Sequence, residues 1–507
     1  GHFWLSSAPS GVAFLRLDRF CLEPGHPQEV CVVTLLGIGL AATRCGERGS
    51  RRNLYVASAI GAAVGLLVMT KLNIGVFVGA SSVLALLLVG PNDLVGRLAR
   101  AAVGVSAAAL PFVLIGRQAT SWEQAALPIA CTCAVAAIWR TATRRNDLGT
   151  IFTWRDAMGF AASLVGVVGA FAGLAIAQGT SWDGLAYGML GQHGGFKTTF
   201  WRTPPLPGAT AAWSVVALAA AFFAHRFPQV IHWFRVALVA ILAVAVVQYL
   251  PDSFKPLLHG LNDRGGAGPL VGLACPLLWV ILAPVGAPDA DAPDPRLAFG
   301  RLMWCALAAL QPLGAFPTPG SQMAVGSLGV ALAGMIALWD VVRTLPSGAA
   351  FGRRLVVGAA SVAFVALVVR DVEYARYRRT LTDLDLPGAR LMRMSEKQAT
   401  EHRWLAKTLR DQTSTFVFGE HARCSLYFWA ELKPPTGLNP TFWPFLLRTS
   451  EQEKIVAALE HREGVGVVHA SFGAPLPTDS PLLAYLAENF EPADAEGEFE
   501  VWLRRSE

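Results

Sequence analysis

Roughly the first 370 residues form a row of apolar stretches, each about as long as a lipid bilayer is thick, separated by short loops. Arginine clusters follow every second stretch: loop 44–52 holds four arginines, loop 91–100 holds two and loop 140–156 holds four. A helix needs about 20 apolar residues to cross the hydrocarbon core, and it satisfies its own backbone groups there. The pattern therefore predicts a polytopic α-helical membrane protein.

We expect about twelve transmembrane helices, and they are placed at 29–43, 54–70, 74–90, 101–116, 125–139, 157–177, 209–225, 236–250, 268–286, 302–316, 322–340 and 355–370. Arginine-rich loops face the cytoplasm in membrane proteins, whereas acidic residues have little influence on orientation. The acidic loop 287–295 therefore leaves the assignment unchanged. The last span then runs outward, so residues 371–507 lie in the periplasm or outside the cell, on the same side as loop 178–208 and the turn at 317–322.

Composition agrees with this class, because 53% of the residues are hydrophobic and only 15% are charged, whereas soluble proteins carry about 25% charged residues. The net charge of +6 comes largely from arginines in short loops between apolar spans, so it predicts no nucleic-acid partner. We divide the chain into an outer juxtamembrane segment (1–28), a transmembrane helical domain (29–370) and an outer domain (371–507).

The outer domain has the composition of a small globular protein. Its expected elements, in order, are a charged helical stretch at 372–412, a β-like run at Thr415–Phe418, an aromatic segment at Ser425–Trp429, a helix at 451–461, a strand at Val465–His469, a helix at 481–489 and a strand at Glu498–Leu503. Strands that alternate with helices indicate a small α/β layer domain.

The most informative polar motif inside the apolar region is Lys71-Leu72-Asn73-Ile74-Gly75, which joins two spans with almost no loop. A lysine near lipid depth is costly and usually faces a cavity or a partner. In that case it binds an anionic group, such as a phosphate, at the outer face. Alternatively, the side chain extends to the aqueous interface without a ligand. The position of the lysine leaves both interpretations open.

A second polar motif, EPGHPQE at 23–29, precedes the first span. Its ionisable side chains, Glu23, His26 and Glu29, are candidates for a catalytic base or a metal ligand. Pro27 followed by an acidic residue is also typical of a first helical turn, where a carboxylate complements the helix dipole. The spacing favours this capping role.

Two outer segments supply candidates for contact with a sugar, an acceptor or a lipid headgroup. Loop 178–208 is rich in glycine and proline and contains Trp182, Asp183, His193, Lys197, Trp201 and Arg202. Aromatic residues also gather at membrane interfaces without binding anything. Gln311 and Gln322 flank a proline-rich turn, where they either line a polar cavity or satisfy backbone groups that proline leaves free.

Five segments together resemble the GT-C superfamily of integral membrane glycosyltransferases, and more closely its bacterial branch related to protein mannosyltransferases and aminoarabinose transferases. They are EPGHPQE at 23–29, KLNIG at 71–75, GTSWDGL at 179–185, FPTPGSQ at 316–322 and LYFWAELKPPTGLNPTFW at 426–443. The resemblance covers most of the chain. It implies a GT-C-like fold in the bacterial cytoplasmic membrane and transfer of a sugar from a polyprenyl-phosphate donor to an envelope acceptor on the outer face.

The mechanism that the resemblance implies is an inverting transfer. A carboxylate deprotonates an acceptor hydroxyl, which attacks the anomeric carbon while the lipid phosphate leaves, and cations stabilise that leaving group. Lys71 is the best candidate for the phosphate-binding cation, with Asn73, Lys197 and Arg202 beside it. Members of the superfamily differ in whether they need a divalent Mg or Mn ion, and the residue spacing of this chain predicts no metal site.

One departure from the superfamily concerns the catalytic base. Its members carry an Asp-Asp or Asp-Glu pair in the first outer loop, and no such pair precedes residue 289 here, where Asp18 is a lone acid. We therefore expect that this sequence lacks N-terminal spans together with that loop. The alternatives are a superfamily member that has lost activity and one in which another acid, such as Glu23 or Glu29, replaces the pair.

Two other functions remain open at this stage. A transporter or flippase-like carrier of a lipid-linked precursor would show internal repeats and broken helices, and no convincing repeat is present. A non-catalytic assembly protein of the envelope would use the outer domain to bind partners. The charge of Lys71 within the apolar region argues against this last function.

Overall fold

The structure of the chain is a computed structural model. It describes residues 27–145, 150–191, 206–224, 226–247, 267–283, 295–316, 321–344, nine positions between 354 and 373, 375–419, 425–436, 447–470 and 480–505. The chain forms two compact units that divide after Glu373, three residues beyond the predicted boundary. We call the first the helical unit and the second the C-terminal unit.

The helices of the helical unit follow the predicted order of apolar stretches. Their bounds are α2 (Pro27–Ala42), α3 (Arg51–Thr70), α4 (Leu72–Leu88), α5 (Leu94–Ile115), η2 (Gly116–Gln118), α6 (Trp122–Thr143), α7 (Trp154–Ala177), α8 (Trp182–Ala186), η4 (Tyr187–Gly191), α10 (Thr210–Phe223), α11 (Pro228–Val247), α12 (Ala267–Ala274), η6 (Cys275–Ile281), α13 (Pro295–Leu310), η7 (Gln311–Ala315) and α14 (Ser321–Thr344).

Six helical segments among the described residues are long and apolar enough to cross a membrane. They are α3, α5, α6, α7, α14 and the segment Leu297–Ala315. Shorter apolar helices occupy five further predicted spans. The span expected at 268–286 is an eight-residue α-helix that continues as a 3₁₀-helix, because Pro276 interrupts the α-helical hydrogen bonding. The number of twelve spans therefore stays a prediction.

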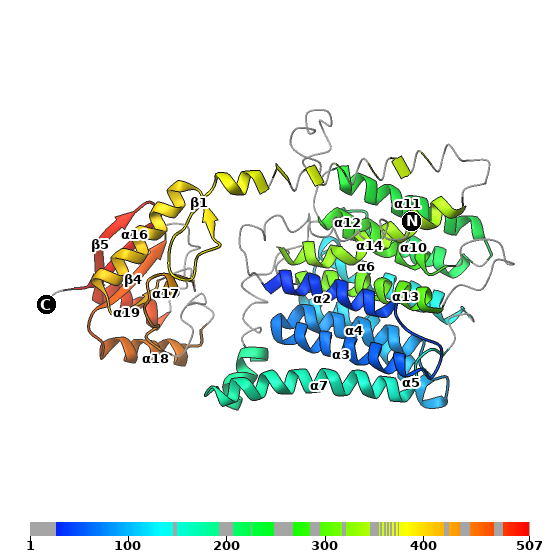
Figure 1. The fold of residues 1–507 in the computed structure, drawn as a ribbon, viewed down its shortest axis with the longest axis horizontal. Coiled ribbons are helices and arrows are strands. Elements are labelled where there is room, and N and C mark those ends of the chain that lie inside the picture. The colour runs from blue at the N-terminus through cyan, green and yellow to red at the C-terminus, as the bar shows by residue number, and fades with distance from the viewer. Residues whose placement is uncertain are drawn as a thin grey trace. The chain divides into compact units, whose positions relative to one another are not determined.

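Glycines bring α3 and α7 into backbone contact (Figure 1). A Cβ atom placed on Gly61 would lie 2.2 Å from the carbonyl oxygen of Phe160, and one on Gly65 would lie 3.0 Å from that of Leu164. Gly61 and Gly65 are four residues apart, the spacing with which small residues let membrane helices approach each other closely. This motif fixes α7 at the edge of the helical unit, where its opposite face is exposed.

The centre of the helical unit consists of α13 and η6. Every residue of η6 is buried, and α13 packs against α2, α4, α6 and α14. The six described cysteines are buried, and Cys275 and Cys305 lie in this central region. They act as small apolar packing residues.

The helical unit has two distinct ends. Gly326, near the start of α14, packs against Pro312 of η7, with a Cβ on Gly326 only 2.9 Å from the Cα of that proline. Asp340 lies fourteen residues further along α14 and pairs with Arg301 of α13. Fourteen helical residues span about 21 Å. The contacts around η7 and the contacts around Asp340 therefore belong to opposite ends.

The C-terminal unit is a three-layer α/β/α domain. Its sheet has the order β3-β4-β6-β5, in which β3 is parallel to β4 and the other pairs are antiparallel. Two helices, α16 and α17, cover one face around Phe416 and Val468, and two more, α18 and α19, cover the other around Val417 and Val467. Alternate residues of β3 and β4 thus serve two separate cores.

The predicted elements of this unit agree with the structure except at its edges. The bounds are β1 (Thr382–Asp383), β2 (Arg393–Met394), α16 (Glu396–Gln412), β3 (Thr415–Phe418), α17 (Ser425–Trp429), α18 (Thr449–Glu460), β4 (Val465–Ala470), α19 (Pro481–Asn489), β5 (Phe490–Glu496) and β6 (Phe499–Arg504). The helix expected over 372–412 is interrupted by the β1–β2 pair, and β5 was not expected because its sequence is acidic and contains a proline.

Candidate functional site

A single residue, Lys71, connects α3 to α4. Its backbone is extended (φ −156°, ψ 98°), and its N–H donates to the carbonyl of Leu67 at 2.7 Å. Gly75 makes this sharp reversal possible, because a Cβ at that position would lie 2.3 Å from the backbone nitrogen of Val68. The two helices therefore meet through their backbones, and the lysine side chain projects from the point where they join.

The α3–α4 junction packs against η7, which lies about 240 residues further along the chain. Asn73 donates from Nδ2 to the carbonyl of Gly314 at 2.7 Å, and Gln311 donates from Nε2 to the carbonyl of Ile74 at 3.3 Å. The structure thus brings together three candidates from the sequence: Lys71, Asn73 and Gln311. We call these three residues and the first turn of α4 the lysine site.

Several polar groups of the lysine site have no partner. The ammonium of Lys71 is half-buried and forms no hydrogen bond or ion pair with any residue that the structure describes. The backbone N–H groups of Leu72 and Asn73, in the first turn of α4, likewise lack an acceptor in the described part of the chain. Gln311 is 2% exposed, and its Oε1 is buried without a hydrogen bond. Such a buried acceptor costs about 1–3 kcal/mol.

This combination suits an anion. The open N–H groups and the dipole at the start of a helix attract negative charge, and α4 is 17 residues long. The ammonium of Lys71 adds a full positive charge at the same helix start.

Arginines gather at the opposite end of the helical unit. The guanidinium of Arg301 binds both carboxylate oxygens of Asp340, at 2.7 and 2.6 Å, and Arg235 lies 3.7 Å from the same carboxylate. The three arginines Arg145, Arg235 and Arg301 also donate to four consecutive carbonyls at the end of η6 and just beyond it, those of residues 280–283. We call this set the arginine cluster.

The arginine cluster is an architectural feature. Cations near the C-terminal end of a helix satisfy its last carbonyls and oppose its dipole. Asp340 is fully buried, and a bidentate pair with a guanidinium offsets part of the cost of burying its charge. The cluster therefore ties α11, α13 and α14 to the end of η6.

The other predicted site residues do not join the lysine site in the described part of the chain. Trp182 and Asp183 are exposed in the first turn of α8, and no hydrogen bond or ion pair links them to Lys71, Asn73 or Gln311. Six further candidates lie outside the described residues: Glu23, His26, His193, Lys197, Trp201 and Arg202. For Glu29 and Gln322 the structure describes the helical backbone but not the side chain.

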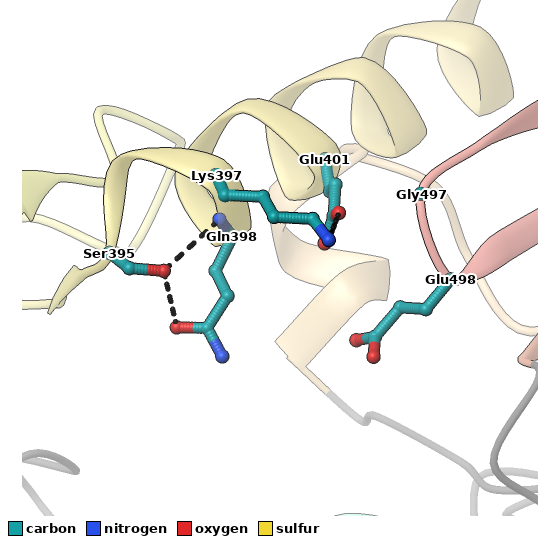
Figure 2. A pocket seen from close by; sticks show the side chains of 6 residues that line it. All are labelled: Ser395, Lys397, Gln398, Glu401, Gly497 and Glu498. Atoms are coloured by element: carbon teal, nitrogen blue, oxygen red, sulfur yellow. Dashed lines mark hydrogen bonds and ion pairs between the residues drawn. The ribbon is translucent and has the colours of Figure 1, made fainter.

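The C-terminal unit has an open polar pocket at the start of α16 (Figure 2). Ser395 caps the helix by accepting from the N–H of Gln398 at 3.3 Å, and Lys397 pairs with Glu401 at 3.7 Å. Gly497, with φ +61°, leaves room for the carboxylate of Glu401, since a Cβ there would lie 2.1 Å from Oε1. Lys397 pairs with one of the two carboxylates that line the pocket, and Glu498 supplies the other.

His469 is a second unusual polar residue of this unit. Its ring packs against that of Trp502 at a tilt of 36°, with centroids 4.2 Å apart, and its Nε2 is buried without a hydrogen bond. Burial lowers the pKa of His469, although the nearby carboxylate of Glu500 acts in the opposite direction. The imidazole is therefore neutral near pH 7.

Sequence reasoning missed the arginine cluster and the Gly61–Gly65 motif. The motif has a local signal, two glycines four residues apart on an apolar helix, whereas the cluster joins residues that are distant in sequence. No group of three His, Cys, Asp or Glu residues within the described ranges could hold a metal ion. Comparison with protein-family models, curated proteins and solved structures finds no significant match.

Proposed function

We propose that this chain is a membrane glycosyltransferase that takes a sugar from a polyprenyl-phosphate donor and passes it to an envelope acceptor on the outer face of the cytoplasmic membrane. The observation that carries the proposal is the unpaired ammonium of Lys71 at the start of α4. An isolated charge among apolar helices is expensive, and a functional ligand is the usual reason for it.

The donor phosphate fits the lysine site by charge and geometry. Its oxygens would accept from the ammonium of Lys71 and from the N–H groups of Leu72 and Asn73. The polyprenyl chain would lie along the apolar outer surface of the helical unit, where Val76 is 45% exposed one turn beyond Lys71.

The reaction breaks the bond between the anomeric carbon and the phosphate oxygen and forms a bond between that carbon and the acceptor oxygen. The acceptor proton passes to a base, for which Glu23, His26 and Glu29 remain the candidates from the sequence. Negative charge develops on the departing phosphate, and Lys71 would stabilise that charge. The same residue therefore serves both binding and departure of the lipid phosphate.

The test compares two substitutions at opposite ends of α3. The Lys71→Met variant removes the cation beside the end of α3, whereas Arg51→Met removes an exposed cation at the start of α3 and serves as the matched control. Binding of a short-chain polyprenyl phosphate to the purified chain in nanodiscs should weaken about 10- to 100-fold in Lys71→Met, because a hydrogen bond to a charged group contributes about 1.5–3 kcal/mol. Arg51→Met should bind as the unaltered chain does.

Two outcomes would contradict the proposal. Equal binding by Lys71→Met and the unaltered chain would show that the phosphate does not bind at the lysine site. Binding without transfer of a radiolabelled sugar from its polyprenyl phosphate to an acceptor fraction of envelope would instead indicate a carrier, since a carrier leaves the sugar on the lipid.

A further inference from the structure

The C-terminal unit has an exposed apolar and basic face next to the point where the chain enters it. Phe428 of α17 is 73% exposed, while the neighbours Leu426, Tyr427 and Trp429 are buried. Leu391 is 66% exposed. Exposed apolar side chains indicate a partner surface when they gather into one patch.

Contacts place these residues on one continuous face. A Cβ on Gly388 would lie 3.9 Å from the Cβ of Phe428, so the loop that carries Leu391 runs beside α17. Arg378 donates to the carbonyl of Leu391 at 2.8 Å, and Arg390 is exposed next to it. We call Arg378, Arg390, Leu391 and Phe428 the Phe428 face.

The charge of the unit is distributed unevenly around this face. Residues 376–393 contain five arginines and two aspartates, whereas residues 490–500 contain five acidic residues and no basic one. Tyr427 of α17 donates from its hydroxyl to the carbonyl of Phe416 in β3, at one edge of the sheet. The acidic residues belong to the β5–β6 hairpin, at the other edge. The unit therefore has a basic, apolar side and an acidic side.

We infer that the Phe428 face docks on the anionic surface of the bilayer that holds the apolar helices of the same chain. Arginines beside exposed aromatic and aliphatic side chains match the charged headgroups and the apolar boundary of such a surface. The apolar stretch before this unit ends at Val369, and the nine residues from there to Arg378 span at most about 32 Å. The face is thus within reach of the membrane. This inference requires a membrane-embedded chain but not a glycosyltransferase.

The experiment uses the full chain in liposomes of anionic phosphatidylglycerol mixed with neutral phosphatidylcholine. A fluorescent label is attached at Phe428→Cys and, as the matched control, at Glu453→Cys on the exposed surface of α18. Both variants carry Cys21→Ser and Cys424→Ser, since the other six cysteines are buried. Quenching by lipid-attached nitroxides reports contact with the bilayer, and quenching by aqueous iodide reports contact with water.

We expect nitroxide quenching and iodide protection at position 428 and the reverse at position 453. Adding Arg390→Glu should lower the docked-to-undocked ratio about fivefold or more in anionic liposomes, because each basic residue near the surface contributes about that factor. Arg462→Glu, an exposed charge reversal distant in sequence from the face, should have no effect. Iodide access at position 428 equal to that at 453 would overturn the inference. Protection from iodide without nitroxide quenching would also overturn it and would indicate a protein partner.

Discussion

The two ends of the helical unit both hold basic side chains, but they hold them in opposite ways. In the arginine cluster every described guanidinium donates to a backbone carbonyl, and Asp340 supplies a buried counter-charge. In the lysine site the ammonium of Lys71 has no such partner in the described residues, and neither has Oε1 of Gln311. Charged groups that have hydrogen-bond or ion-pair partners stabilise the fold of a membrane protein. Charged groups without such partners indicate where a ligand binds.

The largest expected effect comes from removing the counter-charge of the arginine cluster. Asp340→Asn leaves Arg235 and Arg301 without their carboxylate in a buried position, which should lower the free energy of unfolding by about 3–5 kcal/mol. Thermal unfolding of the solubilised chain measures this. Lys71→Met is the comparison, because removal of an unpaired charge from a half-buried position should leave the free energy of unfolding unchanged or raise it. An equal loss of unfolding free energy in the two variants would contradict the distinction between the paired charges of the arginine cluster and the unpaired charge of the lysine site.

A smaller effect is expected from crowding the connection that carries the lysine. Gly75→Ala places a methyl group 2.3 Å from the backbone nitrogen of Val68, so α3 and α4 must separate. Overpacking of this kind costs about 1–3 kcal/mol, and it should weaken polyprenyl-phosphate binding as well as stability. Gly79→Ala is a milder control in the same helix, since its methyl would meet only a side-chain atom of Val64 at 3.3 Å. If Gly75→Ala binds and melts as the unaltered chain does, the tight junction is not needed for the lysine site.

The smallest effect concerns an exposed carboxylate in the connection between α4 and α5. Asp93 caps α5 by accepting from the N–H of Gly96 at 2.7 Å, and Trp154 donates to it from Nε1 at 2.9 Å. Both hydrogen bonds lower the pKa of Asp93, and the bond from Gly96 has the larger effect. A carboxyl with a lowered pKa stabilises the folded state above its unfolded-state pKa, and this stabilisation is lost as the pH falls through the folded-state pKa.

The unfolding temperature of the unaltered chain should therefore drop more than that of Asp93→Ala between about pH 5 and pH 3. Scanning calorimetry of the two proteins in the same detergent measures the difference. Parallel curves for the two proteins would show that the cap contributes nothing that depends on pH.

Hydropathy placed the apolar stretches well but did not reveal their neighbours. Among the six long apolar helical segments, α7 is the most apolar and the least buried, whereas the segment that contains α13 is the least apolar and the most buried. A helix that faces lipid must be apolar around its surface, while a central helix is shielded by other helices and tolerates Arg301. Apolar character therefore predicted correctly that these segments are helices long and apolar enough to cross a membrane, but it did not predict how deeply each one is buried.

The candidate site could be predicted in part for a similar reason. Lys71 and Asn73 stand out locally because polar residues interrupt an apolar run. Gln311 was a candidate through its neighbouring proline, but its bond to the backbone of Ile74 joins segments more than 200 residues apart. No local pattern encodes such a contact, and the same holds for the arginines that converge on η6.

The sequence by itself determined where the helices lie, which residues interrupt them with charge and where β3, β4 and β6 run, because hydropathy and side-chain alternation are local properties. Tertiary structure alone decided which polar groups find partners. The guanidinium of Arg301 reaches Asp340 and the last carbonyls of η6, whereas the ammonium of Lys71 reaches no acceptor in the described chain. That difference arises from packing between distant helices, since a charge is satisfied or left open only by what the fold brings beside it.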